Sequence, residues 1–457
     1  MNRKLFGTDG IRGIANTYPM TAETALNIGR AVAHLFRRDT HRPKIIIGKD
    51  TRISGYMIEE AIVSGICSMG GDAYLVGPLP TPGVAKMVQG QRADAGIVIS
   101  ASHNPFQDNG IKIFSGNGIK LPDEKEHEIE QFIINNTFDR YLPDPEHLGR
   151  AYRIEDAEGR YIVFLKNTFP RDRTLEGVKI VLDCANGATY KVAPRVFWEL
   201  GAEVHTLHTQ PDGFNINLKC GSQHTDDLCR EVVQKGAHIG MAFDGDGDRL
   251  IAVDEQGNTI TGDQIIAVCA GTLSKENMLR EDRVVTTVMS NKGLSKTFKE
   301  MGIEHIKTNV GDRYVLEEMF SCGAVLGGED SGHIIFLDYH TSGDGILTGL
   351  QLLAAMLKEK RPLSELARIV TIYPQMLVNI DVDAKPDLAT LPELQEVVEN
   401  VEQKLGEDGR VLVRYSGTQQ ICRVMIEGPD SATTEAYCEE IAAVIRRTIG
   451  TSGPTNA

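Results

Sequence analysis

Three aspartates at alternate positions, in the run Asp244-Gly-Asp246-Gly-Asp248-Arg249, have the spacing that most directly indicates chemistry in this chain. Like charges this close repel one another, and a hard cation held among them removes the repulsion. A set of oxygen ligands favours Mg²⁺ or Ca²⁺ over zinc, which prefers His and Cys. The run therefore indicates a divalent-cation site, with a solvated acidic turn as the simpler alternative.

A calcium-binding EF-hand loop is a sharper alternative, because the three aspartates fit its first, third and fifth positions and Glu255 falls at the twelfth. The sixth position argues against it, since the sharp turn there needs glycine and this chain has Arg249. The flanking segments 239–243 and 250–254 are short apolar runs, which are typical of strands and not of EF-hand helices. A cation between two strands, beside an arginine, suits a phosphate ester.

Ser102 is a candidate nucleophile, because it follows the strand predicted over 96–100 in the run Ala101-Ser102-His103-Asn104-Pro105. Reactive residues often lie where strands of an α/β sheet end. An ordinary turn is the alternative, and the lack of a G-x-S-x-G motif leaves serine-hydrolase chemistry without support. With His103 and Lys112 close by, a phosphoserine here would carry a charge that the cation site could neutralise.

Two further polar loops contain side chains that could bind a substrate. Arg414-Tyr-Ser416-Gly417-Thr418, with Arg423, is suited to holding a phosphate. Gly328-Glu329-Asp330-Ser331-Gly332-His333 is suited to binding hydroxyls and exchanging a proton. A lone S-G-T run would be no evidence, and the 328–333 loop alone would be interpreted as a capped turn. Together with the nucleophile and the cation site, they indicate phosphoryl transfer on a sugar.

An internal repeat predicts the elements that position these loops. Strand, polar turn, helix with a glycine at its end, and strand occur in this order three times, which predicts three related βαβ domains. A smaller α+β domain without a copy follows them. The expected domains are 1–153, 154–256, 257–371 and 372–457, and the three repeats open with the strands 44–48, 179–183 and 284–288.

The amino-acid composition of the 457 residues is typical of a globular protein. The net charge is −15, from 48 basic and 63 acidic residues. This charge argues against a nucleic-acid-binding surface. The N-terminus lacks the apolar core of a signal peptide, and no run approaches the ~18 apolar residues of a membrane span. The eight cysteines contain no C-x-x-C pair. We therefore expect a soluble, cytoplasmic protein.

Four motifs resemble the α-D-phosphohexomutase superfamily, and within it the bacterial phosphoglucosamine mutases: residues 5–13, 100–105 with 108–112, the DGDGDR loop, and 310–314. The resemblance implies an α/β fold, with three related mixed-sheet domains and a smaller C-terminal α+β domain around a central cleft. It implies interconversion of glucosamine 6-phosphate and glucosamine 1-phosphate, on the route to UDP-N-acetylglucosamine. The reaction would use a phosphoserine enzyme, one Mg²⁺ per chain and a bisphosphorylated hexose as activator and intermediate. No membrane or nucleic-acid partner is implied, and a monomer or homodimer is expected.

The resemblance also assigns residues. The catalytic group would be Ser102, Arg12, His103, Lys112 and His333, and the metal ligands would be Ser102, Asp244, Asp246 and Asp248. Substrate would be bound by Thr8, Asp9, Arg249, Gly311, Asp312, Arg313, Glu329, Ser331, Arg414, Ser416, Gly417, Thr418 and Arg423.

Two positions depart from the family pattern. The phosphate loop continues with Gln419-Gln420 where S-G-T-E-P is usual, and Asp330 stands where the subfamily usually has glutamine. The added charge of Asp330 would either favour an amino sugar's ammonium group or point outward. Phosphomannomutase or phosphoglucomutase activity is the first alternative, followed by a phosphatase and a non-catalytic sugar-phosphate-binding protein.

Overall fold

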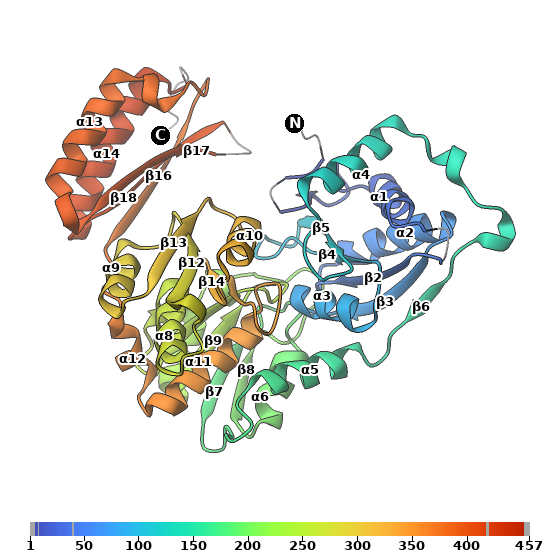
Figure 1. Ribbon diagram of the computed structural model, residues 1–457, viewed down its shortest axis with the longest axis horizontal. Coiled ribbons are helices and arrows are strands. Elements are labelled where there is room, and N and C mark those ends of the chain that lie inside the picture. The colour runs from blue at the N-terminus through green and yellow to red at the C-terminus, as the bar shows by residue number, and fades with distance from the viewer. Residues whose placement is uncertain (1–4, 8, 39–40, 417–419, 452–457) are drawn as a thin grey trace. The chain divides into compact units, whose positions relative to one another are not determined.

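The computed structural model describes residues 5–7, 9–38, 41–416 and 420–451. The chain divides into two compact units, of which the first comprises Met1–Met289 and Gly302–Ile369 and the second Ser290–Met301 and Val370–Ala457 (Figure 1). Within the described residues, the first unit contains three sheets and the second contains one.

The N-terminal sheet has the strand order β1-β5-β4-β2-β3-β6. Helices α1 and α2 cover one face of it and α3 lies on the other (Figure 1). Because both faces are covered, the central strands are continuous apolar runs. The strands are β1 (Ile11–Ile14), β2 (Lys44–Lys49), β3 (Asp72–Pro78), β4 (Ala95–Ile99), β5 (Asp108–Ser115) and β6 (Ala151–Arg153), and the helices are α1 (Ala22–Leu35), α2 (Ser54–Ser68), α3 (Thr81–Gly90) and α4 (Asp123–Asn135).

The other two sheets of the first unit have the orders β11-β10-β9-β7-β8 and β13-β12-β14-β15. The strands are β7 (Lys179–Asp183), β8 (Glu203–Leu207), β9 (Ile239–Phe243), β10 (Leu250–Asp254), β11 (Thr259–Ile260), β12 (Arg283–Thr287), β13 (Glu304–Thr308), β14 (Leu326–Gly328) and β15 (Ile334–Phe336). The helices are α5 (Ala157–Thr168), α6 (Val192–Glu199), α7 (Asp226–Lys235), α8 (Gly262–Lys275), α10 (Asp312–Cys322), α11 (Gly345–Glu359) and α12 (Leu363–Leu366).

The predicted βαβ repeat is confirmed. The strand pairs β2/β3, β7/β8 and β12/β13 are each parallel. The glycine after each connecting helix is left-handed, with φ of 82° at Gly70, 102° at Gly201 and 71° at Gly302. A residue with a side chain adopts this conformation at a cost, so glycine ends the helix and turns the chain toward the next strand.

The second unit contains a small α+β domain, as predicted, together with residues Ser290–Met301. Its antiparallel sheet has the order β16-β18-β17, and alternate residues of β18 (Cys422, Val424 and Ile426) are buried in a core shared with α13 and α14. Its elements are α9 (Lys292–Met301), β16 (Gln375–Asp381), α13 (Pro392–Leu405), β17 (Arg410–Tyr415), β18 (Ile421–Glu427) and α14 (Ser431–Thr448). The predicted α/β fold class is thereby confirmed.

None of the described helices combines the length and the apolar character that crossing a membrane requires.

Candidate active site

The acidic loop joins β9 and β10, which pair as an antiparallel hairpin with Phe243 opposite Leu250. Both strands are buried along their whole length, so the loop extends from a rigid support. Its carboxylates are buried too: Asp244 is 0%, Asp246 1% and Asp248 4% exposed. One oxygen of each lies within 4.8 Å of the others. The loop is therefore not a solvated acidic turn.

Packing requires glycine at both positions between these aspartates. A Cβ on Gly245 would lie 2.6 Å from the carbonyl oxygen of Ser102. Gly247 has a φ of 71°, and a Cβ there would lie 2.5 Å from the Thr189 methyl group. The acidic loop thus approaches the Ser102 backbone more closely than a side chain would allow.

The donor set of this loop fits a hard cation. Among the residues that the structure describes, Oδ1 of Asp246 and Oδ1 of Asp248 are buried and accept no hydrogen bond. Burial, and then the Asp248 and Asp246 charges, raise the pKa of Asp244 well above its usual range. Unpaired buried oxygens and like charges are both costly, and one divalent ion would relieve both.

Ser102 lies directly beside this loop. Its hydroxyl donates to Asp244 Oδ2 at 2.5 Å, although 142 positions separate the two residues. The serine is 1% exposed, and its backbone has the left-handed φ of 52°. A residue with a side chain keeps such a conformation only where its surroundings enforce it. The structure thus brings the predicted nucleophile to the predicted cation site.

Lys112 on β5 places its ammonium group against three carboxylates. Its Nζ lies 2.9 Å from Asp246 Oδ2, 3.3 Å from Asp248 Oδ2 and 3.7 Å from Asp9 Oδ2. Burial alone would lower the pKa of Lys112, but these carboxylates, Asp246 first, raise it well above its usual range. Burial would likewise raise the pKa of Asp248, and Lys112 holds that pKa well below its usual range.

Arg249, at the end of the acidic loop, contacts His103, the residue after Ser102. Arg249 Nη1 donates to His103 Nδ1 at 2.8 Å, so Nδ1 is the unprotonated ring nitrogen. Burial, followed by the charge of Arg249, lowers the pKa of His103 to about 4. The imidazole is therefore neutral at physiological pH, with its Nδ1 3.3 Å from Ser102 Oγ.

The N-terminal segment contributes a charged group to the same region. Asp9 forms ion pairs with Arg12 of β1 and with Lys120. Lys120 Nζ also lies 2.5 Å from Asp312 Oδ2. Burial would raise the pKa of Asp9, but Lys112, Lys120 and Arg12 hold it well below its usual range. Lys120 therefore connects the N-terminal segment to the start of α10.

His333 lies between two carboxylates. Its Nδ1 is 3.7 Å from Asp248 Oδ2 and its Nε2 is 3.6 Å from Asp312 Oδ2. Burial lowers the pKa of His333, and the two carboxylates, Asp248 first, outweigh burial and raise it. A cavity of about 290 Å³ lies beside it, with Lys120 and Asp312 in its lining.

The predicted hydroxyl-binding loop follows β14. Glu329 Oε1 accepts a hydrogen bond from Gly311 N at 3.1 Å, and Glu329 Oε2 accepts one from Ser331 Oγ at 3.3 Å. Asp330 Oδ1 accepts from the Asp263 amide at 3.2 Å, in the first turn of α8. A helix N-terminus favours negative charge, so the unusual carboxylate of Asp330 has a structural partner.

Other predicted residues have the following contacts. Arg313 forms ion pairs with Asp123 and Glu126 of α4. In the second unit, Arg414 on β17 lies opposite Arg423 on β18, and burial followed by the charge of Arg423 lowers the pKa of Arg414. Ser416 is buried at the end of β17. Thr8, Gly417 and Thr418 lie outside the described residues.

Sequence reasoning missed several residues that contact the acidic loop or the Ser102 loop, among them Thr81 and Arg52. Thr81, the first residue of α3, donates through Oγ1 to Asp246 Oδ2 at 2.6 Å. Arg52 donates to the backbone of the Ser102 loop. The signal for Arg52 was present, because Asp50-Thr-Arg52 directly follows the strand β2. The strand-end rule that selected Ser102 also selects these residues.

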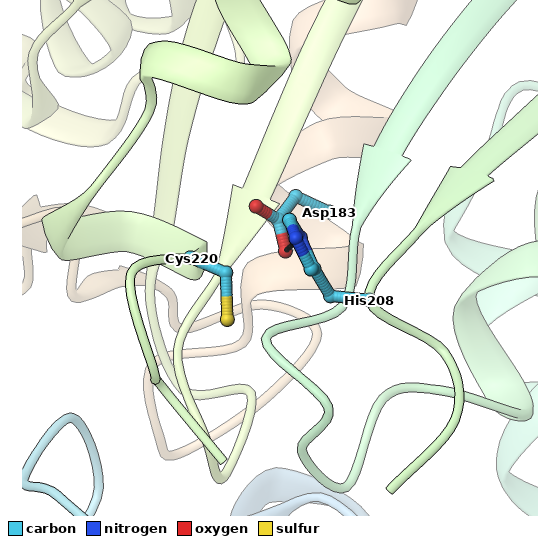
Figure 2. A group of neighbouring side chains, drawn as sticks. All are labelled: Asp183, His208 and Cys220. Carbon is cyan, nitrogen blue, oxygen red and sulfur yellow. Dashed lines mark ion pairs between the residues drawn. The ribbon is translucent and has the colours of Figure 1, made fainter. Parts of the chain in front are cut away.

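A second group of potential metal ligands comprises Asp183, His208 and Cys220 (Figure 2). Asp183 Oδ1 accepts from the Ala185 amide at 2.8 Å, and Asp183 Oδ2 accepts from the Gly221 amide at 2.9 Å. His208 Nδ1 lies 3.0 Å from Asp183 Oδ1. Burial, followed by the Asp183 charge, raises the pKa of the Cys220 thiol to about 12. The Asp183 carboxylate thus joins two loops, beside a neutral thiol.

Four domain families match consecutive parts of the chain. They are phosphoglucomutase/phosphomannomutase alpha/beta/alpha domain I at residues 3–140, domain II at 159–257, domain III at 261–373 and the C-terminal domain at 377–444.

Named relatives resemble the chain over its length. The phosphoglucosamine mutase of Syntrophus aciditrophicus (strain SB) is 63% identical over 447 residues, which cover 98% of this chain and 100% of that protein. The phosphoglucosamine mutase of Syntrophobacter fumaroxidans (strain DSM 10017 / MPOB) is 60% identical over 446 residues, covering 98% and 99%. A crystal structure of a phosphoglucomutase/phosphomannomutase family protein from Burkholderia thailandensis shares the fold, with a TM-score of 0.79, 23% identity and coverage of 97% and 99%.

Proposed function

This chain belongs to the phosphoglucomutase/phosphomannomutase family, and on that premise we propose that it interconverts glucosamine 6-phosphate and glucosamine 1-phosphate. The relatives that match nearly the whole chain at 63% and 60% identity are named phosphoglucosamine mutases, which supports the amino sugar as substrate. The product would serve the synthesis of UDP-N-acetylglucosamine.

The observation that carries the proposed chemistry is the contact between Ser102 Oγ and Asp244 Oδ2 at 2.5 Å. A buried serine hydroxyl at a cation-binding loop is placed to carry a phosphoryl group. Asp244, Asp246, Asp248 and the phosphorylated Ser102 would hold one Mg²⁺, which when bound neutralises charge on the transferring group.

The reaction would proceed in two transfers. In the first, the bond from phosphorus to Ser102 Oγ breaks as a sugar hydroxyl oxygen bonds to phosphorus, and His333 takes the hydroxyl proton. The sugar then carries two phosphates and turns within the site, and its other phosphate returns to Ser102. The same bisphosphorylated hexose would phosphorylate an unmodified enzyme. Lys112, Arg12 and Arg249 supply fixed positive charge for both transfers.

Substrate binding would be shared among the predicted loops. Glu329 and Ser331 would accept from sugar hydroxyls, and Arg414 with Arg423 would bind the distal phosphate. We also assign substrate binding to Thr8, Asp9, Gly311, Asp312, Arg313, Ser416, Gly417 and Thr418, and a catalytic role to His103.

The domain boundaries 1–153, 154–256, 257–371 and 372–457 stay a prediction. We propose a cytoplasmic location, which the free thiols of all eight cysteines support. A monomer or a homodimer is expected.

Turnover by the purified chain tests the function. We expect glucosamine 6-phosphate to be isomerised faster than glucose or mannose 6-phosphate, and the intact mass to include one phosphatase-sensitive phosphate on Ser102. Ser102→Ala should abolish isomerisation and still bind the phosphosugar, whereas Ser64→Ala, an exposed serine on α2, should not change activity. A preference for glucose or mannose would refute the substrate assignment, and an active Ser102→Ala variant would refute the phosphoserine.

A further inference from the structure

Arg52 is a fully buried arginine whose hydrogen bonds go almost entirely to one loop. Its side chain is 0% exposed, and its Nε donates to Asp50 Oδ2 at 2.8 Å. The other two nitrogens of the Arg52 guanidinium carry four N–H groups, and they donate to four backbone carbonyls of the loop that contains Ser102. These acceptors are Ser102 O at 3.0 Å, Asn104 O at 2.8 Å, Asp108 O at 3.0 Å and Pro105 O.

Asn217 also donates to the same loop. Its Nδ2 donates to Ser102 O and to Asn104 O, each at 2.9 Å. Both carbonyls therefore accept one bond from Arg52 and one from Asn217. A carbonyl oxygen has two lone pairs, so these two donors fill its capacity. The Ser102 peptide is consequently held by two side chains, those of Arg52 and Asn217.

Both donors are themselves fixed. Asp50 accepts from Arg52 and also from Ser100 Oγ at 2.6 Å, which ties the arginine to the end of β4. The loop of Asn217 is held at its backbone, where Asn217 N donates to Ala185 O at 2.9 Å. A few residues on, the same loop is held by the hydrogen bond from Gly221 N to Asp183 Oδ2 at 2.9 Å.

We propose that Arg52 and Asn217 are positioning residues, which hold the left-handed Ser102 peptide and thereby direct Oγ to the cation-binding loop during phosphoryl transfer. This inference rests on the proposed function. Neither side chain touches the reacting atoms, and both act through the Ser102 and Asn104 carbonyls.

The geometry indicates that a lysine at position 52 would not reproduce the contacts of Arg52. A lysine ammonium has three donors at one point, whereas the planar guanidinium spreads five over a fork. Arg52→Lys would therefore release several of the loop carbonyls while keeping the charge that Asp50 needs. A reacting atom misplaced by about 1 Å loses about 100-fold in rate.

Two rates measured on the purified full-length chain test the proposal: sugar isomerisation, and release of inorganic phosphate from the phosphorylated enzyme. For Arg52→Lys we expect kcat for isomerisation to fall about 100-fold with KM nearly unchanged. The ratio of phosphate release to isomerisation should rise, because a displaced phosphoserine meets water more easily than sugar. Asn217→Gly removes the second donor without backbone strain, and a fall of about 10-fold is expected while Arg52 remains.

Two controls separate positioning from general destabilisation. Arg283→Lys changes an arginine that also pairs with a carboxylate, Glu304, and donates to a backbone carbonyl. Asn277→Gly changes another left-handed asparagine, with φ of 55°. Both should keep the wild-type ratio. A loss of folded protein lowers both rates by one factor, so an unchanged ratio in Arg52→Lys and in Asn217→Gly would overturn the proposal. A wild-type chain without isomerase activity would instead refute the proposed function.

Discussion

Replacing Lys112 by methionine tests how the acidic loop is neutralised. The Lys112 side chain is 2% exposed, and its Nζ contacts Asp246 and Asp248 at 2.9 Å and 3.3 Å. Removing one partner of a buried ion pair costs about 3–5 kcal/mol, because the other charge stays buried without compensation. We expect Lys112→Met to lose about that much free energy of unfolding in the absence of divalent ions.

Magnesium should restore part of this loss. A ligand at 100 times its Kd stabilises the folded chain by about 2.7 kcal/mol if it does not bind the unfolded chain. In Lys112→Met the ion replaces the missing positive charge, so Mg²⁺ should bind more tightly and stabilise this variant more than the wild type.

The assay is urea unfolding followed by circular dichroism, with EDTA or with Mg²⁺, combined with calorimetric titration of Mg²⁺. Lys275→Met is the matched control, because it removes an exposed lysine that pairs with Glu359 at 2.7 Å and should cost less than about 1 kcal/mol. Equal stabilisation of wild type and Lys112→Met by Mg²⁺ would refute the reasoning, as would a loss below about 1 kcal/mol without it.

Two other positions give further predictions. His340 is neutral, since Nε2 contacts Pro82 O and Nδ1 accepts from Thr341 N, both at 2.8 Å, and burial lowers its pKa from 6.5 to about 4. Between those pH values the unfolded chain binds a proton that the folded chain does not, so the free energy of unfolding falls as pH drops, by about 2.5 kcal/mol at pH 4.5. Urea unfolding of His340→Gln should lack this loss, and equal pH slopes for wild type and variant would contradict the prediction. Gly245→Ala places a Cβ 2.6 Å from Ser102 O, so turnover should fall strongly. Gly159→Ala is the control, because a Cβ at Gly159 would meet no atom within 4 Å. Equal turnover of the two variants would contradict the close approach of the acidic loop to Ser102.

Local patterns predicted the fold well because they depend on neighbours in the chain. Apolar strand runs, the polar turns that follow them and the helix-ending glycines were sufficient for the three βαβ repeats. The strands around the acidic loop also begin and end where their apolar runs do, at 239–243 and 250–254. These signals need no tertiary information.

The missed contacts depend on residues far apart in the sequence. Thr81 reaches Asp246 across 165 positions and Lys120 reaches Asp312 across 192, and nothing near either residue indicates its partner. Asp330 shows the same limit. From the sequence, its carboxylate would either favour an amino sugar's ammonium group or point outward. In the structure it accepts a hydrogen bond from the Asp263 amide at the start of α8, which the sequence around Asp330 does not indicate.

Ser102 donates a hydrogen bond to Asp244 only while its hydroxyl is unphosphorylated. Modification replaces that proton donor by a group of nearly two negative charges, within reach of three buried carboxylates. Under the proposed function, electrostatic repulsion then favours losing the group whenever divalent ions are scarce. The fraction of molecules that carry the phosphoserine would consequently depend on the concentration of free magnesium in the cell, as well as on the bisphosphorylated sugar that restores the group.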